Sequence, residues 1–198
     1  MQRYFLLSII FLCGFLNIQG QEFGGGITLG ASTSQVSGDQ LGGFNKIGLL
    51  TGVFTNIKIK KKLVIQFEIT LIQKGSRNPN IQENNINEIS LNYIETPVMM
   101  KLLQKKGTSI ELGFLPAILL NGNIYDFYGK IDYIDPQFKD YDLGVFAGFN
   151  YPLNEKINLN SRISNSIIPI RNHTSNTTFG INKGQYNTIL SFAINYNI

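Results

Sequence analysis

Eight charged side chains occupy one face of a series of strand-like segments, and they are the residues of this chain best placed for chemistry. Strand side chains alternate between two faces, so residues two positions apart share a face. In these segments one face is apolar, and the other carries glycine, small polar residues and charges. The charges, four of each sign, are Lys46, Glu68, Lys74, Glu95, Lys101, Glu111, Asp142 and Arg162. If the sheet closes with this face inside, the charges must pair there as an interior ionic network.

Only one set of residues resembles a hydrolytic site. His173 is the single histidine, Ser175 lies two residues further on, and Asp126 lies in a separate polar stretch. General-base catalysis needs an imidazole that is close to the hydroxyl and oriented by a carboxylate. Being near neighbours in an Asn-rich loop does not provide that arrangement. We therefore predict that the protein is not an enzyme and that it uses no cofactor.

The longest loop, 121–138, combines acidic and aromatic residues. Asp126, Asp132 and Asp135 could supply oxygen ligands to calcium, but their spacing matches no defined calcium loop, so we predict no metal site. Exposed Tyr and Phe are enriched in protein contacts. Two interpretations of the aromatic residues stay open, a loop that packs on its own rim or a partner-binding loop. The aromatic residues concerned are Tyr125, Phe127, Tyr128 and Tyr133.

Basic residues give the chain a formal net charge of +4, and they are concentrated in short turns. One turn holds Lys58, Lys60, Lys61 and Lys62, and another holds Lys105 and Lys106. Neither turn has interleaved aromatic residues that could stack on bases, so we predict no nucleic-acid partner. Solvated turns that face anionic groups are the better interpretation.

The N-terminus has the pattern of a secretory signal peptide over residues 1–20. Arg3 supplies the positive charge, and Tyr4 to Leu16 form a short apolar core before a cleavage site of the usual kind. Cys13, the only cysteine, follows two bulky residues rather than the small ones that a lipoprotein signal needs, so lipidation is the weaker alternative. The remaining residues, 21–198, are expected to form a single domain.

Periodicity and composition predict a transmembrane barrel for this domain. Charged residues are only 15% of the chain, against about 25% in ordinary soluble domains. Long loops and short turns alternate along the chain, and Pro97 is expected to disturb its strand with a bulge. Both termini then lie on the short-turn side, which is periplasmic in outer-membrane barrels, and the long loops lie outside the cell. The expected strands are 22–36, 44–57, 62–74, 88–103, 108–120, 139–151, 157–167 and 185–198.

Two pairs of tyrosines on the apolar face support this interpretation. Tyr141 and Tyr151 are ten residues apart, as are Tyr186 and Tyr196. In a strand tilted by about 45°, ten residues rise roughly 23 Å along the barrel axis, close to the apolar band of about 25 Å between aromatic girdles. The sequence thus predicts an all-β, eight-stranded antiparallel up-and-down transmembrane β-barrel in contact with outer-membrane lipid.

Two alternatives compete with a plugged membrane barrel. A soluble ligand-binding barrel would turn the face rich in Gly, Ala, Ser and Asn outward, which makes a poor soluble surface. A small pore would need an open lumen, whereas eight strands leave an interior just wide enough for side chains to fill. We therefore expect a side-chain-filled interior, with Lys101 and Glu111 opposite each other across one hairpin.

Several segments also resemble a known family. They are Gly24-Gly25-Gly26-Ile27, Leu29-Gly30, Ser32, Lys46-Ile47-Gly48, Gln73-Lys74-Gly75-Ser76 and Leu91-Asn92-Tyr93-Ile94-Glu95-Thr96-Pro97. Together they resemble the PorT-like outer-membrane β-barrel domain of the Bacteroidota, a family named for a protein required for type IX secretion. Ile198 departs from the aromatic residue that ends many outer-membrane strands. The resemblance implies an accessory subunit of a larger envelope or secretion complex. The alternative is a stand-alone surface barrel whose loops bind an external ligand or protein.

Overall fold

The computed structural model describes residues 23–198 except 40, 82, 84, 134 and 173–183. The expected signal peptide with Cys13, and the pair His173 and Ser175, lie outside the described residues. The strands are β1 (Phe23–Ser37), β2 (Lys46–Lys60), β3 (Leu63–Arg77), β4 (Glu88–Glu95), β5 (Val98–Leu103), β6 (Ser109–Tyr125), β7 (Tyr141–Pro152), β8 (Ile157–Ser166), β9 (Arg171–Asn172) and β10 (Gly184–Asn197).

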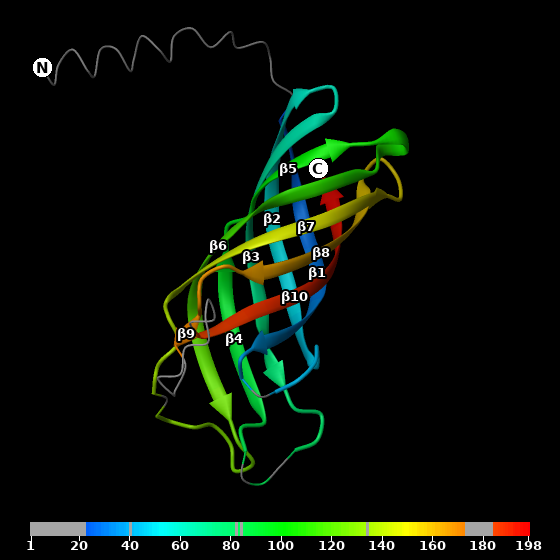
Figure 1. Cartoon of the computed structure of the whole chain (residues 1–198). Coiled ribbons are helices and arrows are strands. Elements are labelled where there is room, and N and C mark those ends of the chain that lie inside the picture. The colour runs from blue at the N-terminus through cyan, green and yellow to red at the C-terminus, as the bar shows by residue number, and fades with distance from the viewer. Residues whose placement is uncertain (1–22, 40, 82, 84, 134, 173–183) are drawn as a thin grey trace, which may run out of the picture.

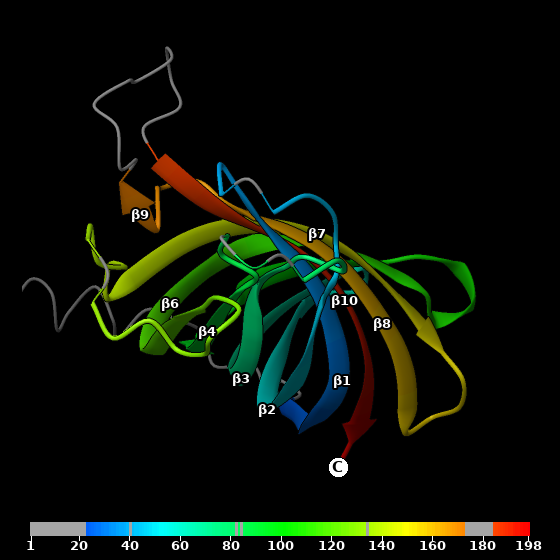
Figure 2. The ribbon, with the colours of Figure 1, turned by 90° about the horizontal axis from the view of Figure 1, so that it is seen from below.

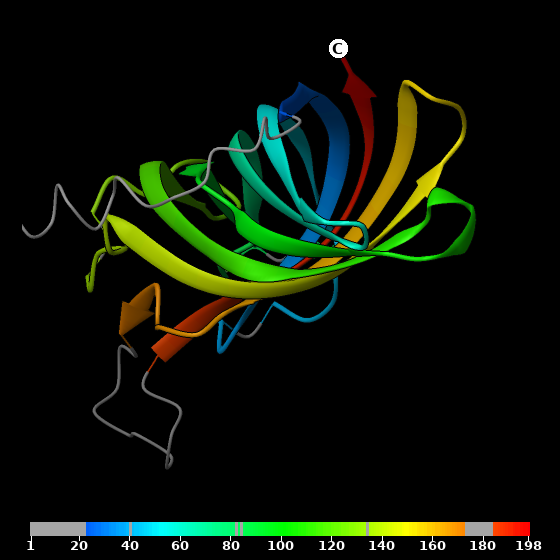
Figure 3. The same cartoon turned by 90° about the horizontal axis from the view of Figure 1, so that it is seen from above.

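The strands form a closed antiparallel ring, as Figures 1 and 3 show. Its order is β1-β2-β3-β4-β6-β7-β8-β10, and pairing of β1 with β10 closes it. β5 continues the position of β4, because both strands pair with β3 and β6. The ring therefore has eight positions, and the predicted eight-stranded up-and-down barrel is confirmed.

The break between β4 and β5 lies where the sequence predicts a disturbed strand. Proline has no N–H to donate, so the ladder cannot run through Pro97. The neighbouring groups bond around it: the backbone N–H of Thr96 donates to the Pro116 oxygen at 2.8 Å, and that of Glu68 donates to the Pro97 oxygen at 3.0 Å. A second irregularity, opposite Asn92 and Tyr93 in β6, was not expected from the sequence.

The two ends of the barrel differ in the lengths of their connections (Figures 1 and 2). At one end β2–β3, β5–β6 and β7–β8 are joined by short turns, and the C-terminus lies there too; we call this the short-turn end. At the other end, the long-loop end, the connections follow β1, β3, β6 and β8. The 3-10 turn η1 (Lys105–Gly107) is at the short-turn end. Within the described part of the chain, no helix is long and apolar enough to cross a membrane.

Alternating burial along each strand agrees with the two predicted faces. In β3, Phe67, Ile69 and Leu71 point outward and are 48%, 59% and 49% exposed. Gln66, Glu68 and Thr70 point into the barrel and are 2–3% exposed. The same alternation holds along β7 and β10. The barrel thus presents an apolar wall outward and encloses its polar residues, which is the reverse of a soluble ligand-binding barrel.

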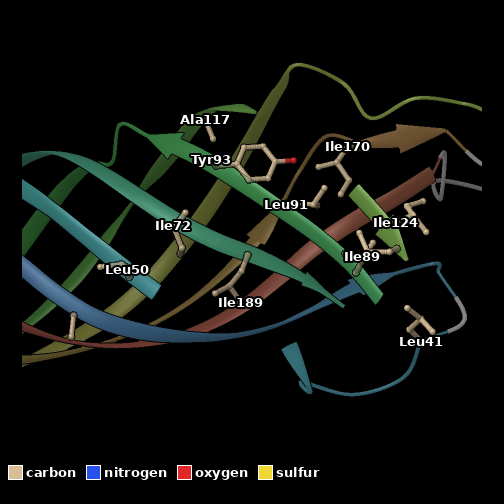
Figure 4. Packing of buried hydrophobic residues seen from close by; sticks show 12 residues of the cluster. Leu41, Leu50, Ile72, Ile89, Leu91, Tyr93, Ala117, Ile124, Ile170 and Ile189 are labelled. Carbon is tan, nitrogen blue, oxygen red and sulfur yellow. The ribbon is translucent and has the colours of Figure 1, made fainter. Parts of the chain in front are cut away.

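The long-loop half of the interior is more apolar than the sequence analysis expected (Figure 4). The cluster runs from loop residues at the rim to strand residues deep in the barrel, with Leu119, Ile131 and Phe138 packed against it. Its members are Val36, Leu41, Leu50, Ile72, Ile89, Leu91, Tyr93, Ala117, Ile124, Ile170, Ile189 and Ala193. Charge pairing alone therefore does not fill the lumen.

Candidate functional site

Arg162 of β8 forms the centre of an ion cluster that crosses the lumen. Its guanidinium donates two hydrogen bonds to Glu68 of β3, at 2.7 and 2.6 Å. In a ring of eight positions, β3 and β8 are four places apart, so this ion pair joins opposite walls. The side chain also lies over the Phe146 ring, 5.0 Å from its centroid. A bidentate pair of this kind fixes both geometry and orientation.

Glu111 of β6 is the second carboxylate of this cluster. It accepts a hydrogen bond from Nε of Arg162. It also accepts bonds from the side-chain amides of Asn150 and Asn160, at 2.6 and 2.9 Å. Lys101 stands directly opposite Glu111 in the β5–β6 ladder, and its Nζ lies 3.5 Å from the Glu111 carboxylate. We call Glu68, Lys101, Glu111 and Arg162 the central ion cluster; its two positive and two negative charges balance.

A second ion cluster lies closer to the long-loop end. Lys74 of β3 pairs with Glu95 of β4, and its Nζ is 3.9 Å from Asp142 of β7. The same ammonium lies 4.8 Å from the centroid of the Tyr93 ring. Asp142 in turn accepts hydrogen bonds from Ser166 at 2.8 Å and from Asn187 at 3.0 Å. Pairing and charge-assisted hydrogen bonds offset the burial of these charges, while Oδ1 of Asp142 accepts no hydrogen bond from the described residues.

The eighth predicted residue, Lys46, takes a partner that the sequence analysis missed. Its Nζ lies 2.6 Å from Glu88, the first residue of β4. Arg77, which pairs with Glu88 in the strand register, approaches the same carboxylate at 3.6 Å. Glu88 lies at a strand terminus, where face alternation is hard to assign from sequence; its charge opposite Arg77 was the available signal. The structure thus places all eight residues in ion pairs, but in separate clusters.

A cavity of about 200 Å³ remains in the lumen at the short-turn end. It lies beyond the central ion cluster, and Lys101 forms part of its wall. Half of the residues around it carry side-chain amides. The lining residues are Phe54, Asn56, Val64, Gln66, Lys101, Leu103, Gly107, Ser109, Asn150, Asn158, Asn195 and Asn197. The interior is therefore filled by apolar residues and ion pairs over most of its length, and it is hollow at one mouth.

A family model agrees with this architecture. The outer membrane protein beta-barrel domain matches residues 19–172, which is more than half of the chain. This chain belongs to that family of outer-membrane β-barrels. Its location is therefore the outer membrane. None of the curated proteins matches it in sequence.

Solved structures of small outer-membrane barrels are similar to it in fold. The crystal structure of neisserial surface protein A (NspA) has 14% sequence identity, covers 91% of this chain and 100% of its own, and gives a TM-score of 0.58. The attachment invasion locus protein Ail of Yersinia pestis has 11% sequence identity, covers 89% of this chain and 99% of its own, and gives a TM-score of 0.54. Ail in complex with the heparin analogue sucrose octasulfate has 10% identity with the same coverage and a TM-score of 0.51. At these identities the likeness shows the fold alone.

The four tyrosines expected to form girdles of this outer-membrane barrel lie near the two ends of its outer wall. Tyr141 and Tyr186 are near the long-loop end, while Tyr151 and Tyr196 are near the short-turn end. Tyr141 and Tyr151 are more than half exposed, and the ring of Tyr196 lies 5.9 Å from Nζ of Lys156. Amphipathic rings at these levels are suited to the headgroup region on either side of a bilayer.

The aromatic loop residues divide between rim packing and exposure. Tyr125 is part of β6 and half-buried, whereas Phe127, Tyr128 and Tyr133 are 53%, 76% and 77% exposed. The rings of Phe127 and Tyr128 meet edge to face, 5.4 Å apart. The loop backbone is held by Asp126, whose carboxylate accepts hydrogen bonds from the N–H groups of residues 128 and 129 at 2.8 and 2.9 Å. Phe127 and Tyr128 are thus presented to solvent by an anchored turn, and Tyr133 is exposed further along the same connection.

Burial shifts two ionisable groups at the long-loop end. Desolvation raises the pKa of the Asp39 carboxyl, although hydrogen bonds from Ser76 and the Leu41 N–H act in the opposite direction. Desolvation lowers the pKa of Arg171, which Asp135 partly counteracts. Arg171 stays paired with its surroundings, donating to the Pro136 oxygen at 2.6 Å and lying over the Phe138 ring at 5.2 Å. In the described part of the chain, no group of three or more His, Cys, Asp or Glu residues is arranged to hold a metal ion.

Proposed function

We propose that this barrel is a non-enzymatic accessory subunit of an envelope protein assembly and that it binds its partner through the long loops. The observation that carries the proposal is the display of Phe127 and Tyr128 on an anchored turn, with Tyr133 exposed in the same connection at the long-loop end. Exposed aromatic residues held in a fixed conformation lose little entropy on binding, so they are effective contacts in protein interfaces.

A second long loop supports the same surface. Tyr128 donates a hydrogen bond from its hydroxyl to Glu83 at 3.3 Å, so the β3–β4 and β6–β7 connections meet. Ile81 and Ile86 in the β3–β4 connection are also exposed. The two connections together offer a mixed aromatic and aliphatic surface at one end of the molecule, of the kind that marks interaction sites.

The resemblance to the PorT-like barrels of the Bacteroidota favours a secretion-related assembly, by analogy with the type IX secretion protein that names the family. The topology favours an orientation in which the long loops are extracellular and both termini periplasmic, since short turns face the periplasm in outer-membrane barrels. The binding surface would then lie outside the cell.

Co-purification tests the proposal directly. A photo-crosslinking residue at position 133, in place of Tyr133, should trap a specific envelope protein before detergent extraction, and affinity purification should recover the same protein. The matched control carries the crosslinker in place of Leu153, which is exposed at the short-turn end. Recovery of the barrel alone, without a partner specific to position 133, would contradict an accessory role.

A stand-alone surface protein that binds an external ligand is the second proposal. It is favoured by a cavity of about 240 Å³ in the β6–β7 connection, lined in part by Lys130, Tyr133 and Phe138. In that case the barrel purifies alone but binds an externally added protein or ligand, and Tyr133→Ala weakens that binding.

A pore is the weakest proposal, because ion pairs and apolar side chains occupy the lumen. Arg162 joins opposite walls, and the apolar cluster fills the long-loop half. Purified protein in planar bilayers should show no steady conductance. Reproducible channels of one size would contradict a closed lumen.

A further inference from the structure

The cavity at the short-turn end has the chemistry of a binding site for a polar anion. None of its lining residues is acidic, and one, Lys101, is a cation. The carboxylates nearest to it, Glu68 and Glu111, are paired with Arg162 in the central ion cluster. They also accept hydrogen bonds from the lining amides of Gln66 and Asn150. The lining of the cavity therefore presents one ammonium group and no carboxylate.

Lys101 is the least engaged member of the central ion cluster. Its Nζ lies 3.5 Å from Glu111, a longer contact than Glu111 makes with Asn150 or Asn160. Glu111 already accepts hydrogen bonds from those two amides and from Arg162, so its charge is satisfied without a close bond to the lysine. An ammonium carries three N–H donors, so the Lys101 ammonium can donate hydrogen bonds to a ligand in the cavity.

The amides around the cavity supply both donors and acceptors. Asn195 accepts a hydrogen bond from Thr28 at 2.9 Å, and its side chain also faces the cavity. The side chains of Asn56 and Asn158 make no hydrogen bond to any residue in the described part of the chain, although both line the cavity. Each amide offers an N–H₂ group and a carbonyl oxygen, the same pair of groups that a peptide bond presents.

Lysines are concentrated at the short-turn end, where the cavity lies. Lys58 lies two residues after Asn56 and so shares its inward face, and its ladder partner, Val64, lines the cavity. All three short turns contribute further exposed lysines, and the single acidic residue described in these turns is Glu155. The lysines are Lys60, Lys61, Lys62, Lys105, Lys106 and Lys156. Charges of one sign around a concave site raise the local concentration of the opposite ion.

We propose that the short-turn mouth binds a small ligand that carries a carboxylate on a peptide-like body, with the carboxylate on Lys101 and the amide groups on Asn56 and Asn158. The cavity of about 200 Å³ has room for a ligand of the size of a capped dipeptide. The site is separate from the long loops, so it does not depend on the partner proposed for them.

The test uses N-acetyl-alanyl-alanine and its C-terminal amide as probes, with the full mature chain folded in detergent. Calorimetry should show that the acid binds at least about tenfold more tightly than the amide, because a charge-assisted hydrogen bond is lost with the carboxylate. Raising the salt concentration should weaken binding of the acid and leave binding of the amide unchanged. In NMR spectra, the side-chain amide signals of Asn56 and Asn158 should shift on binding.

Variants locate the site. Lys101→Met should abolish the preference for the acid, and Lys101→Arg should retain it. Arg77→Met, which removes an exposed cation at the opposite end, should leave the preference unchanged. If Lys101→Met does not fold, Asn56→Leu tests the site instead, because Asn56 lies at the cavity and outside the central ion cluster. This substitution should weaken binding of the acid. Equal binding of acid and amide, binding unaffected by Lys101→Met or Asn56→Leu, or no binding of either probe would each overturn the proposal.

Discussion

Replacing Arg162 with methionine should destabilise the barrel more than any other single change in the ion network. The substitution removes the two hydrogen bonds to Glu68 and the bond to Glu111 while keeping an unbranched apolar side chain of similar length. It leaves both carboxylates buried inside the barrel, at 3% and 0% exposure. Breaking a buried ion pair by removing one partner typically costs about 3–5 kcal/mol, because an uncompensated charge stays behind.

The contacts that remain set where in this range the loss should fall. Among the described residues, Glu111 keeps its amide donors and Lys101, whereas Glu68 keeps the amide of Gln66, at 2.5 Å. The larger share of the loss is therefore expected at Glu68, and we expect a total of about 4 kcal/mol. Neutralising both acids in the triple variant Arg162→Met, Glu68→Gln, Glu111→Gln should recover at least about half of it, since no charge then lacks a partner.

Urea unfolding in lipid vesicles measures these differences. The chain has no tryptophan, so circular dichroism and the heat-dependent shift in gel mobility are the suitable signals. The control is Arg77→Met, which removes a 3.6 Å contact from a side chain that is 56% exposed and should cost less than about 1 kcal/mol. A loss below about 1 kcal/mol for Arg162→Met, or a triple variant less stable than the single one, would refute the reasoning.

Three further changes test the wall, the backbone and the loops. Phe192→Arg puts a charge at the middle of the lipid-facing wall and should lower the free energy of unfolding in vesicles by about 2–4 kcal/mol. The control, Tyr133→Arg in an exposed loop, should change it little. Equal losses for the two variants would contradict a membrane-facing wall. Gly75→Ala should lower the free energy of unfolding by about 2 kcal/mol or more, because φ of Gly75 is +142° and a Cβ there would collide with the Ile89 carbonyl oxygen. An unchanged melting temperature for this variant would contradict the predicted collision. The raised pKa of Asp39 means that its contribution to stability is present at acidic pH and lost as pH rises through the folded pKa. The stability of Asp39→Asn relative to the unmodified chain should therefore increase between about pH 4 and pH 7, and a constant difference would show that burial of this carboxyl does not matter.

Local pattern determined much of the fold. Period-two alternation depends only on the backbone, so it assigned Phe67 outward and Glu68 inward before any partner was known. Hairpin register is equally local, and it paired Lys101 with Glu111 correctly. The missing N–H of Pro97 located the break between β4 and β5 in the same way.

Only the closed ring decided which residues meet across the lumen. Arg162 and Glu68 are far apart in sequence and on opposite walls, so their pairing depends on strand order and on the stagger of every strand between them. The apolar cluster could not be foreseen either, because Leu50 and Ile189 share their faces with polar residues and reveal their role only when loop residues such as Leu41 close over them. The cavity beside Lys101 follows from the same cause: inward alternation identifies the residues of a lumen, while the space left between them depends on how the opposite walls pack.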